Sequence, residues 1–238
     1  MRDKEEKSLK KLIIVPAYNE EASIEKTVEL IRQEADFFDY VVINDCSTDR
    51  TGEICEARGY PVVNLPTNLG IGGAVQTGYR YALRNGYEMA VQVDGDGQHD
   101  PKFLKQMAEY LEENGLDMVI GSRFIERQGF QSSAMRRAGI RFFSVLIRLL
   151  TGARITDPTS GLRIIGKDVL KLFAGEYPKD YPEPESVVTV LGRGFQVGEV
   201  PVVMKERNGG KSSISPGKSV YYMIKVSLAI LFEKMRKE

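Results

Sequence analysis

Residues 91–101 read VQVDGDGQHDP and combine three acidic side chains with the only histidine of the chain, directly after an apolar run. Asp94 and Asp96 can lie on one side of a strand-to-helix loop, where their carboxylates suit an Mg²⁺ or Mn²⁺ ion that also coordinates a diphosphate. Gly95 lets the backbone pass close to a ligand. His99 is either a further metal or phosphate contact or a simple hydrogen-bonding residue of the loop. The segment therefore predicts a divalent-metal site.

Two structural alternatives explain this segment less well. An EF-hand loop requires glycine at its sixth position and glutamate at its twelfth, where this chain has His99 and Lys105. Asp-Gly pairs also favour hairpin turns, but a hairpin needs a second strand, and residues 101–114 have a helical pattern. A loop that joins a strand to a helix is the better interpretation.

Apolar runs alternate with helical patterns between residues 10 and 122, and these elements must position the acidic residues. The alternation is typical of an open, mostly parallel sheet covered by helices, in which ligands bind at the carboxyl ends of the strands. Strands are expected at residues 11–16, 40–45, 61–66, 88–93 and 117–122. Acidic residues follow three of these strands, so a cation or hydrogen-bond donors must lie between them.

Composition limits the class of protein. The 238 residues suffice for one large α/β domain or for one domain with an appendage. Lysine plus arginine equals aspartate plus glutamate at 33 each, so no global field attracts nucleic acid. Cys46 and Cys55 are too few for a disulfide scaffold and fit a reducing cytosol. The charged N-terminus lacks the apolar core of a signal peptide, so we expect a cytoplasmic protein.

Five motifs, in this order, resemble those of the family 2 glycosyltransferases: VPAYNEE, VINDCSTDRTGE, NLGIGGAVQTGY, DGDGQHDP and GSRF. Within that family they are similar to dolichol-phosphate mannose synthase and to bacterial polyprenyl-phosphate sugar transferases. The resemblance implies the GT-A fold, a Rossmann-like α/β fold, and an inverting enzyme that takes sugar from a UDP-, GDP- or dTDP-linked donor. The acceptor would be a polyprenyl phosphate or another lipid-linked acceptor. A saccharide hydroxyl in cell-wall or capsular polysaccharide is the alternative, and a nucleotidyltransferase or a non-catalytic sugar-nucleotide binder is more remote.

The resemblance also implies the roles of individual residues, with Asp94 and Asp96 as the Asp-x-Asp metal motif. Arg163 would contact a phosphate, or else pair with Asp157. Ile71 stands where relatives often carry lysine or arginine, so a donor-phosphate contact is expected to be missing. The residues expected to bind the nucleotide sugar are Pro16, Ala17, Tyr18, Glu20, Asp45, Gly72, Asp94, Gly95, Asp96 and Arg123. Those expected to bind the acceptor or its phosphate are Arg163, Arg207, Lys211 and Ser212.

The nucleophile decides whether a catalytic base is needed. A polyprenyl phosphate is already largely ionised and requires cations, whereas a sugar hydroxyl must lose its proton to a carboxylate. Three carboxylates are candidates: Glu183 and Glu185 in a proline-stiffened loop, and Asp157 in an exposed turn. By the resemblance, Glu183 falls where sugar-to-sugar enzymes keep their base, and Asp157 where lipid-phosphate enzymes keep an acceptor-side aspartate. Both acceptors remain open.

Two segments point to a surface. Residues 123–163 contain eight arginines and no lysine, and a helix from about 133 to 150 would place Phe142, Leu146 and Leu149 on one side. This helix either packs on the core with solvated arginines, lies on anionic lipid or cradles an acceptor phosphate. Residues 219–232 are apolar but shorter than the ~20 residues that span a bilayer. They predict a core helix, a membrane-surface helix or a docking helix for a partner.

These patterns divide the chain into three expected parts: a charged tail at 1–10, the transferase domain at 11–215 and a C-terminal helix at 216–238. The domain has a nucleotide-binding half, 11–122, and an acceptor half, 123–215. Expected partners are the sugar donor, the acceptor and a membrane surface or membrane protein, with homo-oligomers left open. The expected place is the inner face of the cell membrane.

Overall fold

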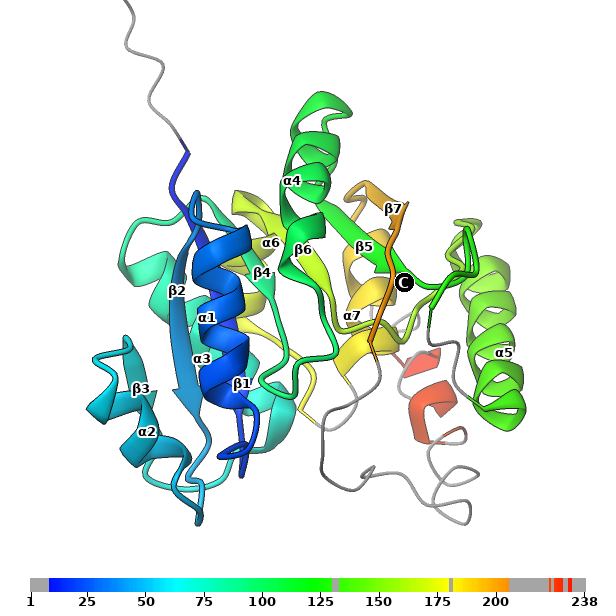
Figure 1. The fold of residues 1–238 in the computed structure, drawn as a ribbon. Coiled ribbons are helices and arrows are strands. Elements are labelled where there is room, and N and C mark those ends of the chain that lie inside the picture. The colour runs from blue at the N-terminus through cyan, green and yellow to red at the C-terminus, as the bar shows by residue number, and fades with distance from the viewer. Residues whose placement is uncertain are drawn as a thin grey trace, which may run out of the picture.

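The chain folds around a seven-stranded sheet in the order β3-β2-β1-β4-β6-β5-β7 (Figure 1). The structure, a computed structural model, describes residues 9–129, 133–179, 182–205, 223, 225–228 and 231–232. The strands are β1 (Lys11–Ala17), β2 (Asp39–Asn44), β3 (Val62–Asn64), β4 (Met89–Gln92), β5 (Met118–Ser122), β6 (Arg163–Gly166) and β7 (Val197–Pro201). The expected mostly parallel sheet and its first five strands are therefore confirmed.

Strand β6 is antiparallel to both of its neighbours, β4 and β5, whereas the other strand pairs are parallel. Its first residue, Arg163, therefore lies opposite Gln92 and Ile120, at the carboxyl ends of β4 and β5. The segment that precedes β6 thus reaches the edge at which the first strands end. The two expected halves of the domain share one sheet.

Helices cover both faces of the sheet. They are α1 (Ile24–Glu34), α2 (Thr51–Ala57), α3 (Gly70–Arg84), α4 (Leu104–Glu113), α5 (Ala134–Thr151), α6 (Lys167–Gly175) and α7 (Pro182–Gly192), with a 3₁₀ turn at Pro101–Phe103 before α4. In Figure 1, α1 and α4 lie in front of the sheet, while α3, α6 and α7 lie behind it. Strands β1, β4 and β5 are therefore buried on both sides, which explains their continuous apolar runs.

The core has one apolar cluster on each face of the sheet. Successive side chains of a strand point to opposite faces. Leu12 and Ile14 of β1 accordingly join the cluster with α3 and α6, whereas Ile13 and Val15 join the one with α1 and α4. Alternating residues of β1 therefore pack into both apolar clusters, which fixes the position of this strand between the two helix layers.

The expected loop that carries Glu183 and Glu185 is instead the first turn of α7, so that prediction is wrong. Proline is tolerated there because the first residues of a helix need no intrahelical N–H bond and proline already has a helical φ. Pro182 and Pro184 are both buried in this turn. The prolines start the helix rather than stiffen a loop.

Apolar C-terminal residues lie next to the core. Met223, residues 225–228 and residues 231–232 have helical backbone, and Val226 is buried. Leu228, Leu231 and Phe232 are exposed. Within the described segments, no helix combines the length and apolar character needed to cross a membrane.

We predict that Gly78→Ala lowers the free energy of unfolding by about 1–3 kcal/mol, because overpacking a close contact strains the core. A Cβ on Gly78 would lie 2.2 Å from Cγ2 of Ile14, at the crossing of α3 and β1. Urea denaturation measures the change. Gly175→Ala in α6 is the matched control, since its Cβ would meet no atom within 4 Å. Equal stability of the two variants would contradict this account of the crossing.

Candidate active site

The carboxyl ends of β1, β2 and β4 meet through direct backbone bonds. The amide of Asp45 donates to the carbonyl of Ala17 at 2.9 Å, and the amide of Gly95 donates to the carbonyl of Pro16 at 3.3 Å. Thr27 of α1 donates to the carbonyl of Gly95 at 3.1 Å. Residues expected to bind a nucleotide sugar are thus brought together at one edge, as the parallel sheet predicts.

A set of cross-loop bonds joins the segment after β1 to the segment after β2. The amide of Asn19 donates to Oγ of Ser47 at 3.0 Å, and Oδ1 of Asn19 accepts from the amide of Thr48 at 2.8 Å. The amide of Glu20 donates to Oγ1 of Thr51 at 2.8 Å. Asn19 has a φ of 56°, which asparagine tolerates better than most residues. This role of Asn19 is not visible in the sequence, because its bonds depend on a loop 28 residues away.

The acidic residues of these two loops are held by hydrogen bonds. Burial acts to raise the pKa of Asp49, but bonds from Thr51 and from the amide of Glu21 outweigh it and lower that pKa. Asp45 is 3% exposed, and its Oδ1 accepts from the amide of Leu69 at 2.7 Å. Asp45 therefore fixes the segment before α3, and Tyr18, at 48% exposed, is the more open member of the expected pocket.

Asp94 and Asp96 differ in exposure. The Asp94 side chain is 31% exposed, whereas Asp96 is 3% exposed and accepts from the amide of Gln98 at 3.0 Å. Oδ1 of Asp94 accepts from Nε2 of Gln92 at 2.7 Å. Nδ1 of His99 accepts from the amide of Asp94 at 3.0 Å. Of the two carboxylates, that of Asp94 is therefore the more accessible to solvent.

Two carboxylates at this edge suit a divalent cation that shares a diphosphate, because Mg²⁺ is usually bound by one or two carboxylates plus substrate phosphates. No preformed group of three acidic, histidine or cysteine residues exists among the described residues, and such sharing does not require one. His99 does not fit as a ligand. Its Nδ1 lone pair is used by the amide of Asp94, so its proton is on Nε2, 3.7 Å from Oδ2 of Asp94.

Asp157 is fully buried, so the expected exposed turn is wrong. Its carboxylate receives two bonds from Arg123, Nε to Oδ2 at 2.7 Å and Nη2 to Oδ1 at 2.8 Å. Glu199 of β7 accepts from the amides of Thr156 and Asp157 at 2.7 and 2.9 Å. Burial raises the pKa of Glu199, against the lowering effect of these bonds. Arg123 is thus committed to this turn rather than open to a ligand.

Arg163 is 1% exposed and does not pair with Asp157. It donates to the carbonyls of Ser160 and Pro158 at 2.7 and 2.8 Å and to Oγ of Ser186 at 2.6 Å. The guanidinium therefore ties the turn before β6 to α7. In this arrangement it is not available to a phosphate, contrary to the expected role.

Glu183 lies close enough to Asp94 for the two carboxylates to interact electrostatically. Burial raises the pKa of the Glu183 carboxyl, Arg163 opposes that rise, and the Asp94 carboxylate adds to it. A carboxyl with a raised pKa beside a reaction centre is a candidate acid or base. Glu185 is partly exposed on the same turn, and its role stays a prediction.

Gly72 has a packing function in α3. A Cβ there would lie 2.2 Å from the carbonyl oxygen of Pro178 and 2.4 Å from that of Lys179. The glycine thus lets α3 meet the chain before α7. Three further expected contacts lie outside the described residues: Arg207, Lys211 and Ser212.

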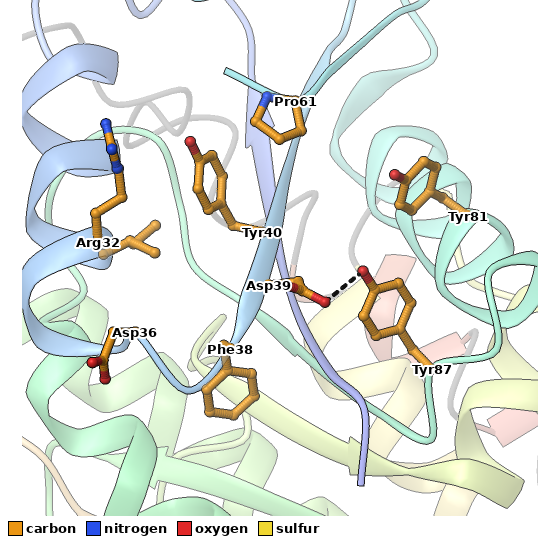
Figure 2. Close-up of a pocket in the computed structure, with 9 residues that line it drawn as sticks. Arg32, Asp36, Phe38, Asp39, Tyr40, Pro61, Tyr81 and Tyr87 are labelled. Carbon is orange, nitrogen blue, oxygen red and sulfur yellow. Dashed lines mark hydrogen bonds between the residues drawn. The ribbon is translucent and has the colours of Figure 1, made fainter. Parts of the chain in front are cut away.

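A separate pocket of about 410 Å³ opens at the amino-terminal end of β2 (Figure 2). Its lining includes Arg32, Tyr40, Tyr81 and Tyr87, and Tyr87 donates to Asp39 at 2.9 Å. None of the expected site residues lines it. Because ligands of such sheets bind at the opposite ends of the strands, this pocket is not the candidate active site.

The chain is similar in sequence to two enzymes that transfer sugars to lipid phosphates. The chain is 30% identical to the undecaprenyl-phosphate mannosyltransferase of Micrococcus luteus, over 94% of this chain and 97% of that protein. It is 26% identical to the UDP-N-acetylglucosamine–dolichyl-phosphate N-acetylglucosaminyltransferase of Methanococcus voltae, over 94% of this chain and 96% of that protein.

The fold matches that of a solved enzyme. Glucosyl-3-phosphoglycerate synthase from Mycobacterium tuberculosis, in complex with Mn²⁺, uridine diphosphate and phosphoglyceric acid, superposes with a TM-score of 0.69 at 20% identity. The match covers 95% of this chain and 78% of that one. The expected GT-A fold is therefore confirmed. Residues 12–173 match the family described as "Glycosyl transferase family 2", and the chain belongs to that family.

Proposed function

We propose that this protein is a metal-dependent glycosyltransferase that moves a sugar from a nucleoside diphosphate to a polyprenyl phosphate. The observation that carries the proposal is the pair Asp94 and Asp96, at the edge where the loops after β1, β2 and β4 meet. Two relatives act on undecaprenyl or dolichyl phosphate, and their names give different sugars. They support the acceptor class and leave the sugar and the nucleobase open.

The residues of the first half would bind the donor. Tyr18, Glu20 and Asp45 would line the nucleoside pocket, held in place by the bonds between the loops after β1 and β2. Asp94 and Asp96 would hold Mg²⁺ or Mn²⁺, which would offset the charge that develops on the departing diphosphate. Arg207, Lys211 and Ser212 are the proposed contacts of the diphosphate and the acceptor.

The environment of the candidate bases favours a phosphate acceptor. A phosphate oxygen is largely ionised near neutral pH, with a second pKa of about 6, and can attack the anomeric carbon without giving up a proton. Asp157 is fully buried and paired with Arg123, so it is not placed to accept a proton from a hydroxyl. In the alternative, transfer to a saccharide hydroxyl, Glu183 would be the base that accepts the hydroxyl proton.

The exposed face of α5 would bring the enzyme to its lipid acceptor at the inner face of the membrane. Met135, Phe142, Val145 and Leu149 are exposed along one helix face, at 68%, 43%, 57% and 78%. The helix carries four arginines and no acidic residue. Apolar residues beside cations suit an interfacial helix on anionic lipid. Leu146, expected on this face, packs instead against the core.

Asp96→Asn is predicted to lower turnover at least about 100-fold, because the donor metal would lose one of its two protein carboxylates. Release of nucleoside diphosphate from a panel of UDP-, GDP- and dTDP-sugars, with Mn²⁺ and polyprenyl phosphate, measures the effect. Circular dichroism checks that the fold is kept. Asp168→Asn on α6, which pairs with Lys171 at the surface, is the control. Undiminished turnover would refute the metal assignment.

Glu183→Gln separates the two acceptor classes. The variant should transfer to polyprenyl phosphate at a rate within about threefold of the native chain and lose at least about 100-fold on a saccharide hydroxyl, where a base contributes 10²–10⁴-fold. Both acceptors are assayed with the same donor. Equal losses on both would mean that Glu183 supports the site rather than the proton transfer.

Leu149→Asp should weaken binding to vesicles of phosphatidylglycerol, because a charge would replace the most exposed apolar side chain of α5. Co-sedimentation measures the bound fraction, with phosphatidylcholine vesicles to test the contribution of anionic lipid. The control is Leu83→Asp, an equally drastic change of an exposed leucine on α3. If both variants sediment like the native chain, α5 is not the membrane-binding face.

A further inference from the structure

The carboxylate of Asp94 is flanked by three residues, one from strand β4 and two from loops. Nε2 of Gln92 donates to Oδ1 at 2.7 Å, and Nε2 of His99 lies 3.7 Å from Oδ2. The third neighbour is Gly161, where an added Cβ would lie 3.2 Å from Oδ2, 3.2 Å from Nε2 of Gln92 and 3.3 Å from Cε1 of His99. The carboxylate therefore has donors or close contacts near both of its oxygens.

Gln92 is an unusual residue for its position. It ends β4, is 1% exposed and follows Met89, Ala90 and Val91, which are all buried and apolar. A buried amide is unfavourable unless it is hydrogen-bonded, so packing alone would favour an apolar residue there. The bond from Nε2 to Oδ1 places the Gln92 amide beside the Asp94 carboxylate, just past the end of β4. The Gln92 amide thus contributes a hydrogen bond to Asp94 rather than apolar packing to the core.

His99 holds the same aspartate through its backbone. Its Nδ1 accepts the amide hydrogen of Asp94, which fixes the tautomer with hydrogen on Nε2 and turns that N–H toward the Asp94 carboxylate. The ring is 4% exposed, so its orientation is set by packing. Gln92 and His99 therefore act on Asp94 from different sides.

We infer that Gln92 and His99 are positioning residues that orient the Asp94 carboxylate for the donor metal. The inference rests on the proposed function, since it assumes that Asp94 binds the ion. A side chain that is 31% exposed would otherwise rotate between several orientations. Partners that orient a metal-binding carboxylate typically change metal affinity or activity 10–100-fold when removed.

Gln92→Met tests this inference because methionine keeps the length of the side chain and removes the donor. The dissociation constant of Mn²⁺, measured by calorimetry in the presence of a nucleoside diphosphate, should rise about 10–100-fold. Turnover should recover at saturating Mn²⁺, so that the metal concentration needed for half-maximal rate changes more than kcat. Gly161→Ala, which leaves Gln92 intact but crowds Oδ2 of Asp94, should change the metal affinity in the same direction.

Gln76→Met is the matched control. Nε2 of Gln76 on α3 donates to the carbonyl of Phe173 on α6 at 3.3 Å, away from the metal motif. This variant should lose some thermal stability and keep the native Mn²⁺ affinity. It separates the loss of a partly buried side-chain amide bond from the loss of an oriented Asp94 carboxylate.

The outcomes distinguish this inference from the proposed function. If the native chain binds Mn²⁺ with the nucleotide and Gln92→Met binds it equally well, with an unchanged metal requirement for turnover, the positioning role is wrong and the proposed function stands. If the native chain binds no Mn²⁺ under these conditions, the metal assignment fails and this inference fails with it. Equal losses of affinity in Gln92→Met and Gln76→Met would also overturn it.

Discussion

The site depends on placing several carboxylates at one edge of a sheet without mutual repulsion. Like charges this close disfavour ionisation unless donors or cations compensate. Backbone and side-chain donors hold most of them individually: Asp45 accepts from the amide of Leu69, Asp96 from that of Gln98, and Asp157 from Arg123. Asp94 is the one with appreciable exposure in the metal motif. Within the proposed metal pair, Asp94 is therefore the carboxylate more open to a cation, with the nearly buried Asp96 beside it.

The antiparallel direction of β6 connects the two halves of the chain at this edge. A parallel strand in its place would begin at the far end of the sheet and bring its preceding loop away from the metal motif. Because β6 is reversed, Gly161 comes against Asp94 and Arg163 comes opposite Gln92. Arg163 then links this turn to Ser186 in α7, so Glu183 is held near the motif. One strand direction therefore determines which residues after β5 lie near Asp94.

Sequence patterns predicted the parts of the molecule that depend on local chemistry. The apolar runs located β1 to β5, and the Asp-Gly repeat located the loop that carries Asp94. The predictions for Asp157 and Arg163 went wrong because each residue was judged from its neighbours, whereas partners distant in sequence bury it. His99 was left open for a related reason, since the choice between ligand and positioning residue depends on which ring nitrogen the fold occupies. The four-residue β6 carries too short an apolar pattern to show its direction.

The geometry also connects the proposed membrane face to the proposed acceptor site. A polyprenyl chain stays in the bilayer, so its phosphate is reachable only at the membrane surface, and the enzyme must present its site there. Helix α5 follows the end of β5, and Oγ of Ser144 donates to the carbonyl of Thr156 at 3.3 Å, next to the buried pair of Asp157 and Arg123. A helix resting on lipid would thus be fixed to the turn that precedes β6. In this proposal the buried pair would help to hold the turn that connects the docking helix to β6.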